Sequence, residues 1–499
     1  MKSRRMILCV VVSLIMIFVM AVPMTASADG AEAKIGDQTY SSLYNAFKDA
    51  KDGDTITVMD NVSVYDKIAI SDGRNITLDL NGHDVSFNYQ DHIQIRHGNL
   101  NITGKGSISE EQPYFSPILM YGSSVDQANY SVVTVGKDVT LKGWAGLFID
   151  NSKSAGNYGI VANVYGTLQG QKDTTGDGGS ALYVNGSIAN ITGNVPKITI
   201  DGATLNNVAG AGMYLAGYAD TTMKNCTVTS SSEGSTGIEI RAGKLDITSC
   251  MITGGSGTFT AKPDGNGSTS GNAALAIAQH TTKLPIKVIV HDGTFKGGAA
   301  VVQDNPQKND TDSIAKVSLS IINGSYQGTV ASENLKNFIS GGEYTQPVAE
   351  EYLSNDVEVA ATYEVDGVKT YLVGKAAVNE KINTAKDGTI TITKASAGTT
   401  LDAPKNGTTL INGTEETIVV GTGDAKVELA KDQTYKAPGQ IDPSQGSTTK
   451  PSGDKDSAKT DAKVKTGDDF NLFAVCDAAL AALIAMGAVV ITGRRRRQK

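Results

Sequence analysis

The chain reads Ile-Thr-Ile-Asp-Gly-Ala-Thr-Leu from Ile198 to Leu205, so that two alternating apolar residues are followed by a short turn and a second inward-facing pair. The pattern returns about 23 residues further on, around Cys226, and again around Cys250. Further copies occur at Val288–Phe295, Leu319–Tyr326 and Asn337–Tyr344, with an imperfect one at Leu78–Val85. A period of two indicates strands. A repeat of about 23 residues indicates stacked coils, because one coil cannot bury its own inner face.

Two cysteines occupy the same place in consecutive repeats. Cys226 and Cys250 each follow the turn, and we expect them to face inward on neighbouring coils, about 4.8 Å apart. Export would permit a disulfide, but parallel Cβ vectors at strand spacing lie slightly beyond the ~3.8 Å that a disulfide prefers. The sequence therefore favours a buried, reduced pair. The equivalent positions of other repeats hold small residues, which are Ala203, Gly293, Gly324 and Gly342.

The segment from Tyr40 to Ile56 predicts how the solenoid begins. Between Ser42 and Ala50, apolar residues recur at the spacing of one helical face. Asp52-Gly53 then ends the helix, and a strand follows at once. The residues expected on the buried face of this helix are Leu43, Ala46, Phe47 and Ala50.

The repeats and this opening helix together resemble the right-handed parallel β-helix of the pectate-lyase-like superfamily. The resemblance covers roughly residues 33–374, within an expected domain of residues 29–374. In that superfamily such a helix plugs the open N-terminal end of the solenoid, and the resemblance implies the same here. The expected fold class is all-β: a right-handed parallel β-helix solenoid with an N-terminal capping helix, a small C-terminal β module, a disordered stalk and a C-terminal transmembrane helix.

The opening segment has a second copy late in the chain. The residues from Ala385 to Ile392 (Ala-Lys-Asp-Gly-Thr-Ile-Thr-Ile) echo those from Ala50 to Val58 (Ala-Lys-Asp-Gly-Asp-Thr-Ile-Thr-Val). This similarity predicts a separate small β module, or a second short solenoid, over residues 375–435. Chance similarity within a strand rich in threonine and isoleucine is the alternative.

The two ends predict export and anchoring. Residues 1–28 combine a basic start, an apolar run and a small-residue cleavage site, which is the pattern of a secretory signal peptide. Residues 470–492 are long and apolar enough to span a bilayer, and the basic tail at 493–499 would stay cytoplasmic. Between the folded part and this helix, residues 436–469 lack large apolar side chains and predict a disordered, wall-spanning stalk.

The stalk ends in a short motif, Lys-Val-Lys-Thr-Gly-Asp, from Lys463 to Asp468. A Thr-Gly pair followed by an apolar span and an arginine tail resembles the cell-wall sorting signal of Gram-positive surface proteins. In that family a sortase cleaves between Thr and Gly of Leu-Pro-x-Thr-Gly and joins the threonine to peptidoglycan. Thr466 and Gly467 match the motif, whereas Lys463 and Val464 replace Leu and Pro. These replacements argue against cleavage by a standard sortase, whereas a variant sortase or simple retention in the membrane would explain the same residues.

Charge and composition exclude some partners. The chain has a formal net charge of -8, and its exported middle is more negative still because basic residues gather at the two ends. An acidic surface repels phosphate backbones, which argues against nucleic acid as a partner. The middle contains only three arginines, and these are Arg74, Arg96 and Arg241.

No strong catalytic motif accompanies the repeats. The chain has neither the Gly-His-Gly nor the Arg-x-Lys motif that polygalacturonase-like relatives of this fold need. The best local cluster is His92, Gln94 and Arg96, which would point outward on one strand and could contact successive sugars. Trp144, the single tryptophan, is a candidate for stacking on sugar rings, with a buried packing role as the alternative.

No cofactor is expected, although the glycine-rich loop holding Asp173 and Asp177 could bind calcium. Outward residues of a solenoid are expected to stay hydrated, so the pKa shifts should be small and scattered. Two functions remain open. One is a non-catalytic adhesin or glycan-binding rod on the cell surface, with host or dietary glycans as partners. The other is a wall-attached polysaccharide lyase or glycoside hydrolase acting on acidic glycans.

Overall fold

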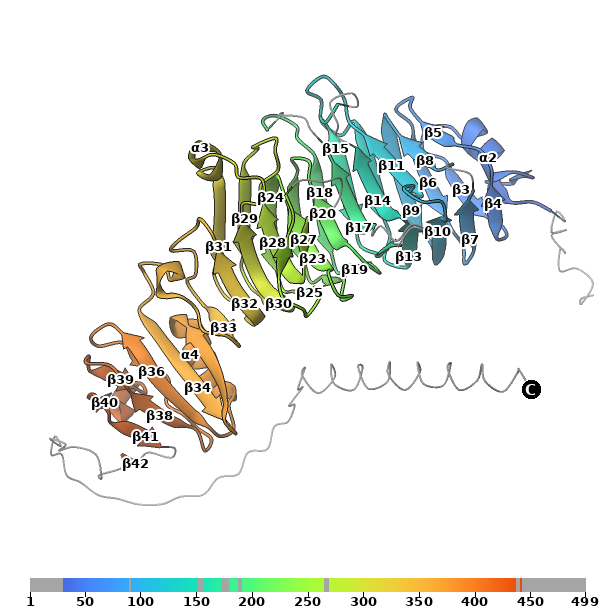
Figure 1. Cartoon of the computed structure of the whole chain (residues 1–499). Helices are drawn as coiled ribbons and strands as arrows, with labels where there is room; N and C mark the ends of the chain where they lie inside the picture. Colours follow the sequence, from blue (N-terminus) through green and yellow to red (C-terminus); the bar gives the residue numbers. More distant parts are fainter. Residues whose placement is uncertain are drawn as a thin grey trace, which may run out of the picture. The chain divides into compact units, whose positions relative to one another are not determined.

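Parallel strands stacked in register form most of the molecule (Figure 1). The computed structural model describes residues 30–88, 91–150, 156–171, 179–186, 191–263, 269–436 and 440–441. The expected signal peptide, almost the whole stalk, the transmembrane segment and its tail lie outside these residues, as do Asp173, Asp177, Thr466 and Gly467. Within these ranges, no helix has the length and apolar character needed to cross a membrane.

Each coil contributes strands to three ladders, here called the first, second and third ladder, and within each ladder neighbouring coils pair in parallel. The first ladder belongs to the 12-stranded sheet and contains β3 (Thr55–Val58), β6 (Asn75–Asp79), β9 (Gly98–Thr103), β12 (Ser131–Val135), β15 (Ile160–Val164), β18 (Lys197–Asp201), β21 (Asp220–Lys224), β24 (Gly243–Thr248), β29 (Ile286–Val290) and β31 (Val317–Ile321). The second contains β4 (Val62–Val64), β7 (Asp84–Phe87), β10 (Gly106–Glu110), β13 (Val139–Gly143), β16 (Thr167–Gly170), β19 (Thr204–Asn206), β22 (Thr227–Thr229), β25 (Cys250–Thr253), the start of β30 (Gly293–Asp304) and of β32 (Ser325–Ser332), and β33 (Gly342–Tyr344).

The third ladder positions the candidate site. It contains β5 (Ile68–Ile70), β8 (Ile93–Ile95), β11 (Ile118–Tyr121), β14 (Ala145–Asp150), β17 (Ser180–Asn185), β20 (Ala211–Leu215), β23 (Thr236–Ile240), β28 (Ala273–Ala278) and the ends of β30 and β32. Between β25 and β28 the chain makes an excursion over residues 254–272, which carries the small hairpin β26 (Thr260–Ala261) and β27 (Ser270–Gly271). A short helix, α3 (Thr311–Ile314), precedes β31.

The alternating apolar residues face a continuous interior. Ile198 and Ile200 of β18 and Leu205 of β19 are buried, as the repeat predicts. Their partners in the next coil are Thr221, Met223 and Val228, in unbroken register. The prediction of an all-β fold built from stacked parallel coils is therefore confirmed.

The predicted opening helix is present as α2 (Leu43–Asp49), and its four expected residues are all buried. The guanidinium of Arg74 donates hydrogen bonds to the carbonyl oxygens of Phe47 and Ala50, so it satisfies the C-terminal end of the helix. Beside α2, β1 (Ala33–Ile35) pairs with β3 in the antiparallel sense, and β2 (Gln38–Tyr40) pairs with β1. At its N-terminal end, the parallel first ladder therefore continues into the antiparallel strands β1 and β2.

The inward residue after the turn differs in size from coil to coil, and the next inward residue differs in the opposite sense. Where it is Cys226 or Cys250, the next inward residue is aliphatic; where it is Gly324, the next inward residue is Tyr326. A Cβ added at Gly324 would lie 2.8 Å from the carbonyl oxygen of Gly293, so the column narrows there. The rings of Phe295, Tyr326 and Tyr344 stack with centroids 5.2 and 4.8 Å apart and fill that space.

The last strands enclose a second core that begins at Val359, earlier than the expected boundary at residue 374. The chain first forms the antiparallel pair β34 (Val359–Val365) and β35 (Val368–Val373), and β35 also pairs with β33. The remaining elements are two 3₁₀ turns, Glu350–Tyr352 and Gly423–Ala425, and α4 (Gly374–Thr384), β36 (Thr389–Ala395), β37 (Thr400–Leu401), β38 (Thr409–Asn412), β39 (Ile418–Val420), β40 (Val427–Leu429), β41 (Thr434–Lys436) and β42 (Gln440–Ile441).

The late echo of the opening segment adopts the same local structure as the original. In both copies a helix is followed by a turn with a glycine in the left-handed region, Gly53 and Gly388, each at a φ of 85°. A strand then starts a parallel pair, β3 with β6 and β36 with β38. Further on, β37 and β39 are parallel, while β40 pairs antiparallel with β39 and β41 pairs antiparallel with β38. The module therefore begins like a short solenoid and ends in antiparallel strands.

Candidate functional site

The outer face of the third ladder carries the predicted strand cluster. Gln94 is buried, Arg96 is exposed, and the Arg96 Nε donates a hydrogen bond to Gln94 Oε1 at 2.9 Å. The Arg96 guanidinium lies 4.1 Å from the centroid of the Tyr121 ring, on the next coil. His92 is buried at the start of β8. The structure thus brings two of the three predicted residues together and adds Tyr121, which sequence analysis did not connect with them.

The strand register places residues of three consecutive coils beside the contact between Arg96 and Tyr121. Gln94 pairs with Leu119, and Leu119 with Phe148, while Tyr121 pairs with Asp150. Leu119, Tyr121, Phe148 and Asp150 are all partly exposed. Side chains at strand spacing, about 4.8 Å apart, therefore form a partly open surface along the solenoid axis.

Trp144 belongs to an aromatic cluster on the same face. Its ring centroid lies 5.7 Å from that of Tyr114, which is 51% exposed, and 5.0 Å from that of Tyr183, which is buried. The rings of Tyr183 and Tyr214 follow at 4.9 Å. Trp144 itself is half-buried, so it combines the packing role with a partly accessible ring. Exposure therefore falls along the cluster, from the half-exposed Tyr114 to the buried Tyr183 and Tyr214.

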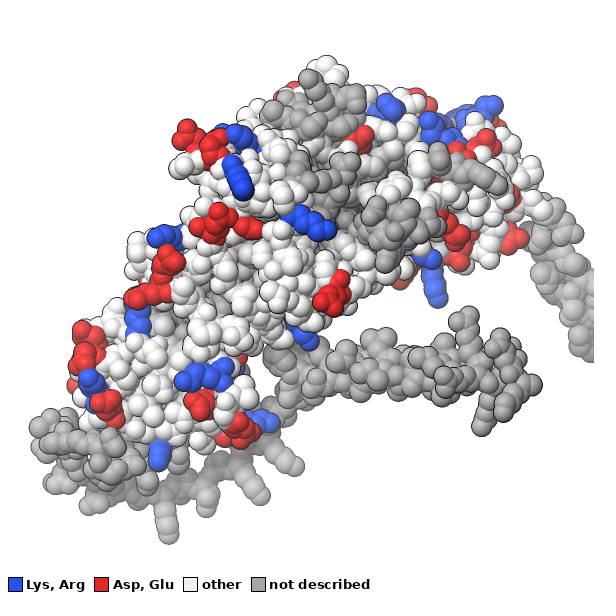
Figure 2. All heavy atoms as spheres, in the orientation of Figure 1, with Lys and Arg blue, Asp and Glu red and all other residues white. Residues whose placement is uncertain are grey.

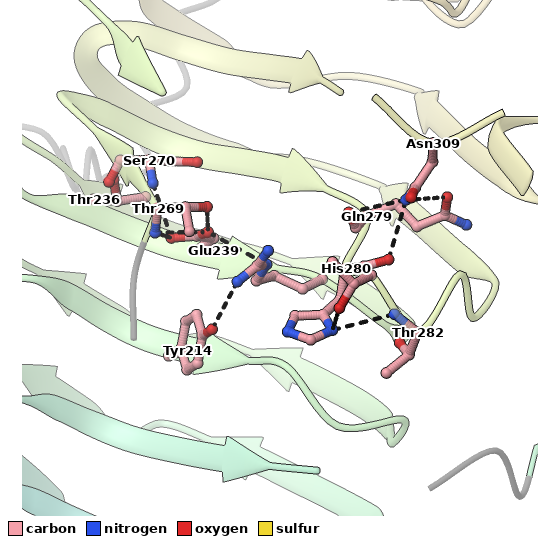
Figure 3. A network of polar contacts seen from close by, with 11 residues as sticks. Tyr214, Thr236, Glu239, Thr269, Ser270, Gln279, His280, Thr282 and Asn309 are labelled. Carbon is pink, nitrogen blue, oxygen red and sulfur yellow. Dashed lines mark hydrogen bonds and ion pairs between the residues drawn. The ribbon is translucent and has the colours of Figure 1, made fainter. Parts of the chain in front are cut away.

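Beyond Tyr214 the same face contains a buried polar network (Figure 3). Arg241 donates a hydrogen bond to the Tyr214 hydroxyl at 3.0 Å, and its Nε lies 3.9 Å from Glu239 Oε1. Glu239 accepts hydrogen bonds from the backbone N–H groups of Thr269 and Ser270 and from the Thr269 hydroxyl. Both charged side chains have no exposed surface.

Burial controls the ionisation of the two tyrosines. Loss of solvent raises the pKa of Tyr183 to about 12, although the positive charge of Arg241 opposes the rise. Burial also raises the pKa of Tyr214, again against Arg241. Both hydroxyls are therefore neutral near pH 7, and the network contains hydrogen-bond donors rather than a phenolate base.

The expectation that outward residues stay hydrated is wrong for this face. Ala145, Tyr183, Ala211, Tyr214 and Ala216 form an outer apolar cluster, and a second one follows around β28 and β30. The excursion before β28 covers the second cluster and Glu239: Phe259 packs against the cluster, and Thr269 binds the carboxylate. A pattern in the sequence does signal this burial, because strands buried on both faces read as continuous apolar runs. Ala-Ala-Leu-Ala-Ile-Ala at 273–278 is such a run.

Two acidic features bear on catalysis. Burial, together with the neighbouring Glu333 carboxyl group, raises the pKa of Asp304. A hollow of about 690 Å³ in the module is lined by Glu364, Asp366, Asp387, Lys369 and neighbouring threonines. Three carboxylates and a lysine therefore meet at one hollow, but outside the solenoid and on exposed side chains. Within the described ranges, no group of three or more His, Cys, Asp or Glu residues could hold a metal ion.

No known protein family matches this chain, no curated protein matches it, and no solved structure matches it. Its own fold and site therefore define its class. It is an all-β protein of stacked parallel coils whose outer face carries an aromatic and polar surface that is open at one end and covered at the other.

Proposed function

We propose that this protein is a non-catalytic adhesin or glycan-binding rod, displayed at the cell surface, that binds glycans at the open end of the third ladder. The observation that carries the proposal is that the outer face of the third ladder presents Arg96 against the partly exposed ring of Tyr121 at one end of its strands and partly exposed Trp144 beside Tyr114 at the other end. Aromatic side chains with a few placed polar groups are typical of small-molecule and sugar sites. Figure 2 shows acidic and basic side chains interspersed over the visible face, which suits a neutral polar ligand better than a polyanion.

The parallel ladders and the helix that closes their first end support a right-handed parallel β-helix like that of the pectate-lyase-like superfamily as the finer description of the fold. In this proposal the solenoid is a rigid support that presents the site away from the cell. Fold likeness alone assigns no activity, because unrelated functions share such supports.

A glycan array probed with the purified protein tests the binding function. We expect the Tyr114→Ala and Arg96→Ala variants to bind at least about tenfold more weakly, because exposed aromatic and arginine side chains dominate binding free energies. Tyr114 is half exposed, so its loss should leave the fold intact.

Tyr65→Ala is the matched control, because Tyr65 is also an exposed tyrosine, on the turn between β4 and β5 and outside the site strands. Equal binding by all three variants and the parent chain, or no bound glycan at all, would remove the proposed site.

A wall-attached lyase or hydrolase is the second candidate, because Arg241, Glu239 and Tyr214 bring a cation, a carboxylate and hydroxyl donors onto the same face. The two candidates differ in one observable. Release of shortened glycans that is lost in a Glu239→Gln variant would replace the binding function with the enzymatic one. Binding without product release supports the rod.

Surface display in this proposal depends on the C-terminal signal. Sortase and peptidoglycan are the proposed partners, and the membrane holds the chain through residues 470–492. We expect Thr466→Ala to shift the protein from the cell-wall fraction to the membrane fraction, because a sortase transfers the threonine carbonyl. Ser447→Ala in the stalk is the matched control. An unchanged wall fraction for Thr466→Ala would overturn linkage through this threonine, whereas a parent chain found only in the membrane fraction would argue for retention by the membrane segment alone.

A further inference from the structure

Cys226 and Cys250 lie on adjacent coils as the repeat predicts. Their neighbours Thr227 and Met251 are paired in register between β22 and β25, and the backbone N–H of Cys226 points at the Cys250 sulfur, 3.4 Å away. Both side chains are 2% exposed, and both are free thiols in this structure. Strand spacing places their Cα atoms about 4.8 Å apart, which is within the range of about 4.4–6.8 Å that a disulfide spans.

The two thiols differ in chemistry. The Cys250 thiol donates a hydrogen bond to the carbonyl oxygen of Thr248, and its contact with the neighbouring Cys226 thiol lowers the pKa of Cys226. The same contact and burial raise the pKa of Cys250. The thiolate is the nucleophile in disulfide chemistry. In the packed coils the two sulfurs are therefore neighbours, and Cys226 is the more acidic thiol of the pair.

We propose that Cys226 and Cys250 are a cross-coil disulfide site that closes during folding in an oxidising compartment and locks two consecutive coils together. The oxidant is a low-molecular-weight disulfide. The thiolate of one cysteine, written here as Cys226, attacks one of its sulfurs and releases one small thiolate. The Cys250 sulfur, after losing its proton, then attacks the Cys226 side of the mixed disulfide and releases the second. The protein loses two hydrogen atoms, and the small disulfide is reduced to two thiols.

Burial fixes when this reaction occurs. In the packed solenoid the sulfurs are covered by neighbouring coils, so a small disulfide reaches them before the coils close. A bond between adjacent coils also restricts the unfolded chain, which stabilises the folded state. Proposed export supplies the oxidising compartment in which such bonds persist.

The experiment uses the full chain, unfolded and reduced, then refolded either with a mixture of reduced and oxidised glutathione or with reduced glutathione alone. Free thiols are blocked with N-ethylmaleimide before digestion with trypsin. Trypsin cuts after Lys224, Arg241 and Lys244, so the two cysteines fall on different peptides. We expect a linked pair of these peptides, lighter by two hydrogen atoms than their sum, and a higher midpoint of thermal unfolding for the oxidised sample.

Cys226→Ser and Cys250→Ser are the matched controls, and each should abolish the linked pair and the rise in midpoint. The tryptic peptides of the unsubstituted chain test the proposal even where a serine variant folds poorly. Recovery of both cysteines as blocked free thiols after oxidising refolding would overturn the proposal. A link from either cysteine to Cys9 or Cys476, or a linked form that unfolds at a lower temperature, would overturn it as well.

Discussion

Replacing Arg241 with methionine should lower the free energy of unfolding by about 3–5 kcal/mol, the usual cost of removing one partner from a buried ion pair. Arg241 and Glu239 are both fully buried, so the remaining carboxylate would lose its nearby cation without gaining water. The Tyr214 hydroxyl would also lose the donor that now lies 3.0 Å away. Methionine preserves most of the side-chain length, so the expected loss is electrostatic.

Urea unfolding and hydrogen exchange of β20 and β23 measure this effect. Arg96→Met is the matched control, because Arg96 lies on the same face of the ladder and is exposed; its change should stay within about 0.5 kcal/mol. The double variant Arg241→Met/Glu239→Gln should be less destabilised than Arg241→Met alone, because it leaves no unpaired charge. A loss below about 1 kcal/mol for Arg241→Met would show that the network contributes little to stability.

A second large effect is expected inside the solenoid. Tyr326→Ala should lower the free energy of unfolding by about 3–5 kcal/mol, because it opens a cavity between two stacked rings. Tyr326 has no exposed surface, and its hydroxyl donates to the Asn323 carbonyl oxygen at 2.8 Å. A larger residue in place of Gly324 could not fill the space left by the ring, because the backbone there has a φ of 127°, which residues with a side chain rarely adopt.

The shift in thermal unfolding midpoint checks this prediction, and Tyr326→Phe separates its two contributions. Phenylalanine retains the ring stack and removes only one hydrogen bond, so the expected cost falls to about 1 kcal/mol. Similar losses of stability for the alanine and phenylalanine variants would mean that the hydroxyl, and not the ring, provides the stabilisation.

Local patterns predicted the fold well because each coil repeats one interaction. Period-two alternation fixed which side of each strand faces inward, and Cys226 and Cys250 are buried on adjacent coils as expected. The helix at Leu43–Asp49 followed from its apolar spacing alone. The echo at Ala385 predicted a second helix-turn-strand unit, although not that β34 and β35 join the same core.

The outer face was predicted less well, because its burial depends on distant segments. Whether Glu239 is hydrated depends on where Thr269 and Ser270 pack, and no pattern within β23 contains that information. The pairing of Arg96 with Tyr121 likewise depends on register between coils of unequal length. Such excursions vary in length from coil to coil, so the sites they create are not set by the repeat.

The antiparallel strands at two edges of the parallel ladders bear on how a second copy of the chain could add to them. A parallel ladder can accept another parallel strand at either end, and a second molecule could supply it. β1 lies antiparallel on β3 at the first edge of the first ladder, and β35 lies antiparallel on β33 at the last edge of the second ladder, so these two edges present a strand of the opposite direction. At these two edges, adding a further parallel coil from a second copy of the chain is therefore blocked by the chain's own antiparallel strand.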